Sequence, residues 1–141
     1  MQSSVLILLV FCISVCQAIL GIGRQQSVAV SGRLICNGQP ASGVKIKLYD
    51  VEVTLDRLLQ EGQTDQNGVF RVGGSATEIS NIDPKLNIYH RCNYNGICYK
   101  KVSIKIPDQF ISDGSTARQT YDIGTLNLAN QFSGESTDCI N

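Results

Sequence analysis

The sequence has few residues that serve proton transfer and no excess of charge of either sign. His90 is the one histidine among 141 residues, so a single side chain has an ordinary pKa close to neutral pH. The 12 basic and 12 acidic residues balance, which argues against a nucleic-acid-binding protein, because such proteins are usually strongly basic. After residue 20, no run is long and apolar enough to span a bilayer. Asn-x-Ser/Thr sequons are also missing, so recognition through an N-linked glycan is not expected.

Residues 1–18 have the pattern of a secretory signal peptide. The segment from Val5 to Val15 is apolar except for one serine, and Cys16 and Ala18 occupy the −3 and −1 positions of a small-residue cleavage site. A membrane anchor is the alternative, but it needs about 18–20 apolar residues, and Gln17 and Gly21 interrupt the run too early. We therefore expect cleavage after Ala18 and a secreted, extracellular mature protein that is not transmembrane.

The chain that remains after cleavage has a normal size for one domain. We expect a short leader over residues 19–26 and a single domain over residues 27–141. Two of the six cysteines leave with the signal peptide, and the remaining four favour two disulfides in an oxidising compartment. Four cysteines permit three pairings. We favour Cys92–Cys98 across a hairpin loop and Cys36–Cys139 between the first strand and the tail.

Alternation of apolar and polar residues predicts short β-strands through most of the domain. The clearest case is a hairpin in which residues 86–92 and 98–106 flank a polar loop. A phase slip beside Gly124 suggests a β-bulge in the last strand. The other predicted elements are strands over 28–36, 44–49, 69–72 and 121–128, an edge strand over 62–65, a short connecting helix over 55–59, and irregular segments over 73–83 and 108–118. Some seven strands with almost no helical periodicity predict an all-β sandwich.

The candidate chemical groups favour structural roles. His90 has the phase of Leu86 and Ile88, so we expect it on the core face with a hydrogen-bond partner rather than in catalysis or metal binding. Zinc would need further nitrogen or thiolate ligands. The sequence Asp-Gln-Asn-Gly at 65–68 is interpreted as a turn, because a calcium loop would need an acidic residue at its far end. The sequence therefore predicts no catalytic residue, no metal site and no cofactor.

The polar faces of the predicted strands suggest a binding surface. Lysines alternate on the strand over 44–49, and basic residues and tyrosines gather on the hairpin. An ordinary solvated sheet face is the alternative. If the faces lie in one sheet, they form a basic strip with tyrosines that suits an anionic partner, either a protein patch or an acidic phospholipid. The candidate binding residues are Lys45, Lys47, Tyr89, Arg91, Tyr94, Tyr99, Lys101 and Lys105.

Several blocks that together cover nearly the whole mature chain carry a family resemblance. They are GRLICNGQPASGVKIKLYD (32–50), GQTDQNGVFRVGG (62–74), DPKLNIYHRC (83–92), KVSIKIPD (101–108), TYDIGTLNL (120–128) and GESTDCIN (134–141). In this order they resemble the nematode transthyretin-like family. The resemblance implies a secreted protein with a transthyretin- or prealbumin-like Greek-key β-sandwich. It implies less about activity, because a shared fold does not carry a shared function.

The wider superfamily contains a hydrolase and a hormone carrier. The 5-hydroxyisourate hydrolase uses several histidines, an arginine and a C-terminal Tyr-Arg-Gly-Ser motif, whereas this chain has one histidine and ends Asp-Cys-Ile-Asn. We therefore expect no enzyme. Some family members are thought to bridge cell surfaces, which makes a non-enzymatic binding module for a cell-surface protein or an anionic phospholipid the leading hypothesis. A carrier of a small apolar ligand, held in or between sandwiches, is the alternative.

Overall fold

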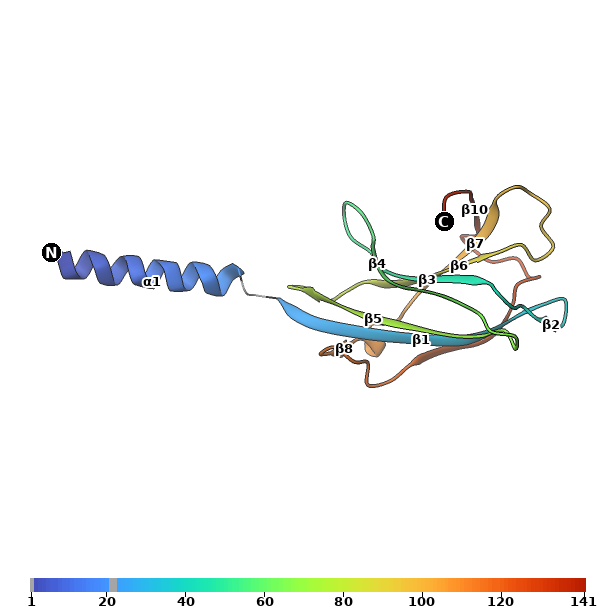
Figure 1. The fold of residues 1–141 in the computed structure, drawn as a ribbon, viewed down its shortest axis with the longest axis horizontal. Coiled ribbons are helices and arrows are strands. Elements are labelled where there is room, and N and C mark those ends of the chain that lie inside the picture. Colours follow the sequence, from blue (N-terminus) through green and yellow to red (C-terminus); the bar gives the residue numbers. More distant parts are fainter. Residues whose placement is uncertain (1, 21–22) are drawn as a thin grey trace.

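A computed structural model describes residues 2–20 and 23–141, with side chains from 2–12 and 23–141. The predicted signal peptide and leader thus lie partly outside the described residues. The N-terminal segment forms helix α1 (Gln2–Leu20). No helix in the described ranges is both long and apolar enough to cross a membrane. The remainder is a sandwich of two five-stranded sheets that face each other (Figure 1). The predicted all-β sandwich is confirmed.

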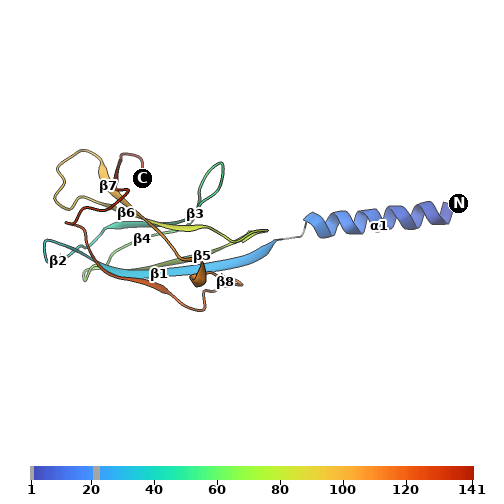
Figure 2. The same ribbon diagram turned by 180° about the vertical axis from the view of Figure 1, so that it is seen from behind.

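The first sheet is organised around the long strand β1 (Arg24–Cys36). β1 pairs with antiparallel β5 (Val69–Glu78), with parallel β9 (Tyr121–Asn127), and with the short strands β2 (Gln39–Pro40) and β8 (Ser112–Asp113). The second sheet has the order β10 (Ser136–Asp138), β7 (Tyr99–Lys105), β6 (Pro84–His90), β3 (Lys45–Asp50), β4 (Arg57–Gln63). The view from behind shows the same two layers, with the C-terminus on the side of the second sheet (Figure 2).

The core lies between the sheets and is built from the apolar phase of each strand. Side chains of alternate residues point to opposite faces of a strand, so the even-numbered residues of β3 and β6 face inward. The buried core residues include Val28, Val30, Leu34, Ile46, Leu48, Phe70, Val72, Leu86, Ile88, Val102, Ile106 and Leu128. The inward and outward faces predicted from the alternation are confirmed. The polar residues of the same strands therefore form the outer face of the second sheet.

Strands β1 and β5 are longer than the sequence indicated. β1 begins at Arg24, inside the predicted leader, and Arg24 pairs with Glu78 at the far end of β5. Residues 73–78 belong to the segment over 73–83, which is expected to be irregular because it is polar. A Cβ on Gly74 would lie 2.9 Å from Leu59 Cβ of β4. The glycine therefore permits the close approach of β4 to β5.

The connecting helix predicted over 55–59 is wrong. Residues 57–63 form β4 and pair with β3, since one or two isolated helical turns are less stable than a ladder of hydrogen bonds with a neighbouring strand. The irregular segment over 108–118 contains a single 3₁₀ turn at Asp108–Phe110 and β8. The bulge beside Gly124 is confirmed, because the pairing of β1 with β9 shifts register there and Gly124 has φ +74°.

Both predicted disulfide pairings are wrong. The structure joins Cys36 to Cys92 and Cys98 to Cys139. Cys36 ends β1 and Cys92 follows β6 with its side chain in the core, so this bridge links the two sheets. The second bridge forms because the tail contains strand β10, which pairs with β7. The polar sequence of the tail did not predict this strand. Asp138 pairs with Tyr99, and this register places Cys139 opposite Cys98.

Candidate binding surface

The outer face of the second sheet, defined by the odd-numbered residues of β3, β6 and β7, brings most of the predicted binding residues together. The strand register places Lys45 beside Tyr89 and Tyr89 beside Lys101 in one cross-strand row. Lys47 lies in the next row, and Tyr99 and Lys105 lie at the two ends of β7. Lys45 and Tyr89, which are 44 positions apart in the sequence, are thus neighbours on a single face.

Acidic or polar partners face the lysines of this surface. The ammonium nitrogen of Lys47 lies 3.7 Å from Glu61 Oε1 on β4, and that of Lys101 lies 3.5 Å from Asp138 Oδ2 on β10. Lys45 donates to Asn141 Oδ1 at 2.8 Å. These partners come from an edge strand and a tail that the sequence did not place there. The lysines therefore do not form a strip of unpaired positive charge.

Lys105 and Lys85 complete the charged pattern. Lys105 is well exposed and its ammonium nitrogen lies 4.0 Å from Asp83 Oδ1, which makes a loose pair. Lys85 donates to Asp56 Oδ2 at 2.9 Å. This hydrogen bond from Lys85 lowers the pKa of the Asp56 carboxyl, so Asp56 is ionised at neutral pH and is held against β6.

Arg91 and Tyr94, the other two predicted binding residues, are engaged in the loop between β6 and β7. The guanidinium of Arg91 donates to the carbonyl oxygens of Gly96 and Ile97, at 3.1 and 2.6 Å, and lies 4.6 Å from the ring centroid of Tyr99. The ring of Tyr94 packs so closely against Gly96 that no Cβ fits there. These contacts give Arg91 and Tyr94 structural roles in shaping the loop.

A groove of about 420 Å³ crosses the outer face. One wall is the loop that follows β3 and the other is the C-terminal tail, while β3, β6 and β7 provide the floor. The lining residues are Tyr49, Thr54, Leu55, Asp56, Lys85, Asn87, Tyr89, Lys101, Asp138 and Ile140. Of the predicted binding residues, Tyr89 and Lys101 lie in the groove and Lys45 lies in the same row.

The floor of the groove is a neutral hydrogen-bonded chain. Ser103 Oγ donates to Asn87 Oδ1 at 2.7 Å, and Asn87 Nδ2 donates to Tyr89 Oη at 3.2 Å. Burial raises the pKa of Tyr89 to about 12, so its phenol stays protonated at physiological pH. Such a floor can present hydrogen-bonding groups to a partner, but it contains no nucleophile with an adjacent base.

The rims of the groove are apolar and exposed. Leu55 is 80% exposed on one wall and Ile140 is 94% exposed on the other. Apolar rims around a tyrosine and ion pairs match the composition of protein–protein interfaces better than that of an anion-binding strip. The sequence missed these rims because isolated apolar residues in a loop and a tail carry no periodic signal. The floor was partly predictable, because Asn87 and Tyr89 share the outward phase of β6.

His90 lies away from the groove, on the core side of β6, as predicted. It is 2% exposed, and its Nδ1 accepts a hydrogen bond from the Cys92 N–H at 3.1 Å. Its Nε2 lies 3.7 Å from Glu135 Oε1. Burial lowers the pKa of the imidazole, so His90 is neutral at neutral pH. This geometry gives His90 a role in holding the turn after β6.

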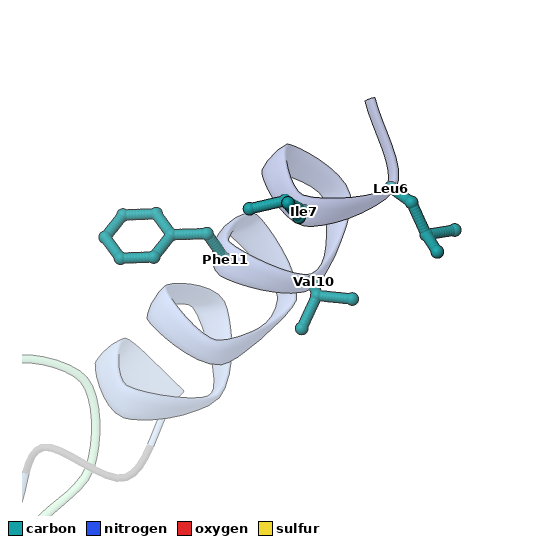
Figure 3. Close-up of a pocket in the computed structure, with 4 residues that line it drawn as sticks. All are labelled: Leu6, Ile7, Val10 and Phe11. Atoms are coloured by element: carbon teal, nitrogen blue, oxygen red, sulfur yellow. The ribbon is translucent and has the colours of Figure 1, made fainter. Parts of the chain in front are cut away.

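Other hollows bear on the hypothesis of a carrier. An apolar hollow of about 330 Å³ is lined by Leu6, Ile7, Val10 and Phe11, whose side chains project from helix α1 (Figure 3). This segment is the predicted signal peptide. A hollow beside β1 and β5 is lined mainly by polar groups, among them Gln60, Arg71 and Thr116. Neither hollow is an apolar chamber within the sandwich.

Comparison with known proteins assigns this fold and its sequence blocks to one group. The model of the Transthyretin-like family matches residues 31–107. Transthyretin-like protein 5 of Caenorhabditis elegans is 50% identical over 123 residues, covering 84% of this chain and 88% of that protein. Transthyretin-like protein 33 of the same organism is 41% identical over 137 residues, covering 92% and 95%. Transthyretin-like protein 2 is 39% identical over 129 residues, covering 85% and 86%.

Proposed function

The chain belongs to the transthyretin-like family, and on this premise we propose that it is a secreted, non-enzymatic binding protein. Its partner is an extracellular or cell-surface protein, which docks in the groove on the outer face of the second sheet. The observation that carries the proposal is the meeting of Tyr89 and Lys101 with the exposed side chains of Leu55 and Ile140 around one groove. Tyrosine is enriched at protein interfaces and among their hot spots, and exposed apolar side chains offer area that a partner can bury.

Secretion is supported by the disulfides and by the predicted signal peptide. Cys36–Cys92 and Cys98–Cys139 use every cysteine of the domain, and such bridges persist in oxidising compartments. A binding role without catalysis is supported by the state of the candidate acid–base groups. The phenol of Tyr89 stays protonated and the imidazole of His90 is buried away from the groove.

A protein partner has more support than an acidic membrane. Each unpaired lysine or arginine near an anionic bilayer contributes about 1 kcal/mol. On this face Lys47 and Lys101 lie beside Glu61 and Asp138, and breaking those pairs would offset much of that attraction. A carrier for a small apolar ligand has less support still, because the groove of the sandwich has a polar floor.

The test compares a double and a single surface substitution in the disulfide-intact mature protein, residues 19–141. Leu55→Asp with Ile140→Asp changes both rims, while Ile97→Asp changes a side chain that is 93% exposed in the loop between β6 and β7, outside the groove. Binding of each labelled protein is measured on intact cells of the source animal and on vesicles containing acidic phospholipid. We expect the rim variant to bind cells at least tenfold more weakly and Ile97→Asp to bind like the wild type.

Equal binding of the rim variant and the wild type to cells would reject the groove as the docking site. Binding of the wild type to acidic vesicles as tight as its binding to cells, with loss of both at high salt, would instead favour the membrane as partner. Lys101→Glu further distinguishes a protein partner from a membrane partner. The substitution should abolish binding to vesicles only if this lysine contacts the lipid.

A further inference from the structure

Three carboxylates from separate parts of the chain meet at one end of the sandwich. Asp50 is the last residue of β3, Glu78 is the last residue of β5, and Glu52 lies in the loop that follows β3. One oxygen of each carboxylate lies within 4.8 Å of the others. The alternation of residues did not predict this cluster, because the packing of one sheet on the other brings Glu78 at the end of β5 to Asp50 and Glu52 at the end of β3.

Asp50 supplies an unpartnered oxygen to the cluster. The residue is 0% exposed, and its Oδ1 accepts a hydrogen bond from the Asp83 N–H at 2.9 Å. Its Oδ2 is buried and has no hydrogen-bond donor among the described residues while the neighbouring carboxyl groups are ionised. A buried carboxylate oxygen without a donor is unfavourable unless a proton or a cation neutralises it.

Glu52 and Glu78 increase the excess of negative charge. Glu52 Oε1 is also buried without a hydrogen-bond donor among the described residues, although the Arg57 Nε lies 3.4 Å away. Arg57 is half exposed, and among the described residues it is the one cation in an ion pair with the cluster, through Glu52. Hydrogen bonding to Asp50, burial and interaction with Glu52 raise the pKa of Glu78 to about 7. Among the described residues, three carboxylates are thus accompanied by one guanidinium, which contacts Glu52.

The cluster is open on one side. Glu52 and Glu78 line a hollow of about 470 Å³ together with Thr54, Ser80, Asn81 and Asp83. An ion can enter through this hollow, and water can occupy it. Ca²⁺ takes six to eight oxygen ligands, commonly carboxylates and water, in flexible geometry. Zn²⁺ prefers nitrogen and sulfur ligands, which are not part of the cluster.

We propose that Asp50, Glu52 and Glu78 form a binding site for a divalent cation, with Ca²⁺ as the preferred ion. The buried oxygen of Asp50 provides the fixed ligand, Glu52 and Glu78 close around the ion, and water in the hollow completes its coordination. Extracellular Ca²⁺ modules commonly have Kd values of about 10⁻⁴–10⁻³ M, and three carboxylates opposed by one arginine are consistent with that range.

The site also bears on the loop that forms one wall of the groove. Glu52 lies in this loop, its N–H donates to Asp56 Oδ1 at 3.3 Å, and Asp56 lines the groove. A bound ion would hold the start of the loop against β3 and β5. The cation site does not depend on the proposed docking function, and its test uses no docking partner.

The experiment is a Ca²⁺ titration of the disulfide-intact mature protein at pH 7, followed by calorimetry and by thermal unfolding. We expect saturable binding, release of protons from the cluster and a rise in Tm of several degrees at millimolar CaCl₂. Glu78→Gln keeps the size of the side chain and removes its charge, so it should fold without Ca²⁺ but bind the ion at least tenfold more weakly. Glu61→Gln, which changes a carboxylate on β4 outside the cluster, should bind like the wild type.

Two results would overturn the proposal. One is a wild-type Tm that does not change up to 10 mM CaCl₂ together with no heat of binding, which would mean that the carboxylates only share a proton. The other is a Glu78→Gln protein that folds and binds Ca²⁺ as tightly as the wild type, which would place the ion elsewhere.

Discussion

The ammonium group of Lys101 lies 3.5 Å from the carboxylate of Asp138, and this pair attaches the C-terminal strand to the outer face of the second sheet. Both side chains are largely buried, and the tail they hold forms one wall of the groove. This wall of the groove is therefore held by the Lys101–Asp138 ion pair as well as by the Cys98–Cys139 disulfide.

Asp138→Asn should weaken the attachment of the tail. The substitution keeps the shape of the side chain and removes its charge, so we expect the free energy of unfolding to fall by about 1 kcal/mol, as for a partly buried ion pair. Urea unfolding under non-reducing conditions measures the change. Asp122→Asn, in which the altered carboxylate lies on β9 away from any described ion pair, is the matched control. Equal free energies of unfolding of Asp138→Asn and the wild type would show that the Lys101–Asp138 ion pair does not stabilise the protein.

The two disulfides should differ in what they stabilise. Removal of Cys98–Cys139 by a double substitution to serine should release β10 and the tail, while the core between the sheets stays intact. Removal of Cys36–Cys92 breaks a link between the sheets and should lower the free energy of unfolding of the whole domain by about 2–5 kcal/mol. Thermal unfolding and hydrogen exchange distinguish the two effects. Peptide mapping of the non-reduced protein checks the pairing itself, and a Cys92–Cys98 peptide would contradict it.

Tyr89→Phe tests the floor of the groove. The substitution removes the hydroxyl that accepts a hydrogen bond from Asn87 and leaves the ring in place. Because a buried donor then lacks its acceptor, we expect a loss of about 1 kcal/mol in the free energy of unfolding. Chemical denaturation measures it. Tyr121→Phe on β9 is the control, and a loss no larger than that of the control would mean that the Asn87–Tyr89 bond contributes nothing.

The acidic cluster predicts an unusual pH dependence. Because the pKa of Glu78 in the folded protein is raised from 4.5 to about 7, the native state binds more protons than the unfolded state between these values. Without Ca²⁺, the contribution of Glu78 to the free energy of unfolding should therefore fall as pH rises from about 4.5 to 7, by an amount on the order of 1 kcal/mol after solvent screening. The neighbours that set this behaviour are Asp50 and Glu52. Buried His90, whose pKa is lowered, contributes in the opposite direction, so the contribution of Glu78 is read from a comparison with a variant.

Glu78→Gln should remove the contribution of residue 78 to the pH dependence of the free energy of unfolding, since a glutamine side chain does not titrate. Unfolding by urea at several pH values, with a chelator present, compares the two proteins. A wild-type stability with the same pH dependence as that of Glu78→Gln across this interval would contradict the raised pKa of Glu78.

The parts of the fold that repeat with a period of two could be predicted from the sequence. In β3 and β6 the apolar residues Ile46, Leu48, Leu86 and Ile88 alternate with polar ones, and burial of one face dictates that the other carries the lysines and Tyr89. The shared face, the core position of His90 and the bulge at Gly124 all follow from that pattern. Where one face of a strand is buried, the local alternation of residues suffices to predict which side chains point to the core and which point outward.

The features that the sequence did not reveal depend on contacts between distant segments. The tail over residues 133–141 is polar except for Cys139 and Ile140, so its pairing with β7 and the resulting Cys98–Cys139 bridge had no local signal. The residues over 55–59 favoured a helix locally, but residues 57–63 form a ladder of hydrogen bonds with the edge of β3 instead. The ion pairs of Lys47 and Lys101 arise from the pairing of strands, and the carboxylates around Asp50 meet because the two sheets pack together.

Hydrogen exchange of the mature protein, alone and with the partner captured from the cell surface, is the most direct test of the groove as the binding site. We expect protection on binding in residues 51–56, 85–89, 99–103 and 136–141, which surround the groove. Protection confined to β1, β5 and β9 on the opposite sheet, with no change in these four segments, would contradict the proposal.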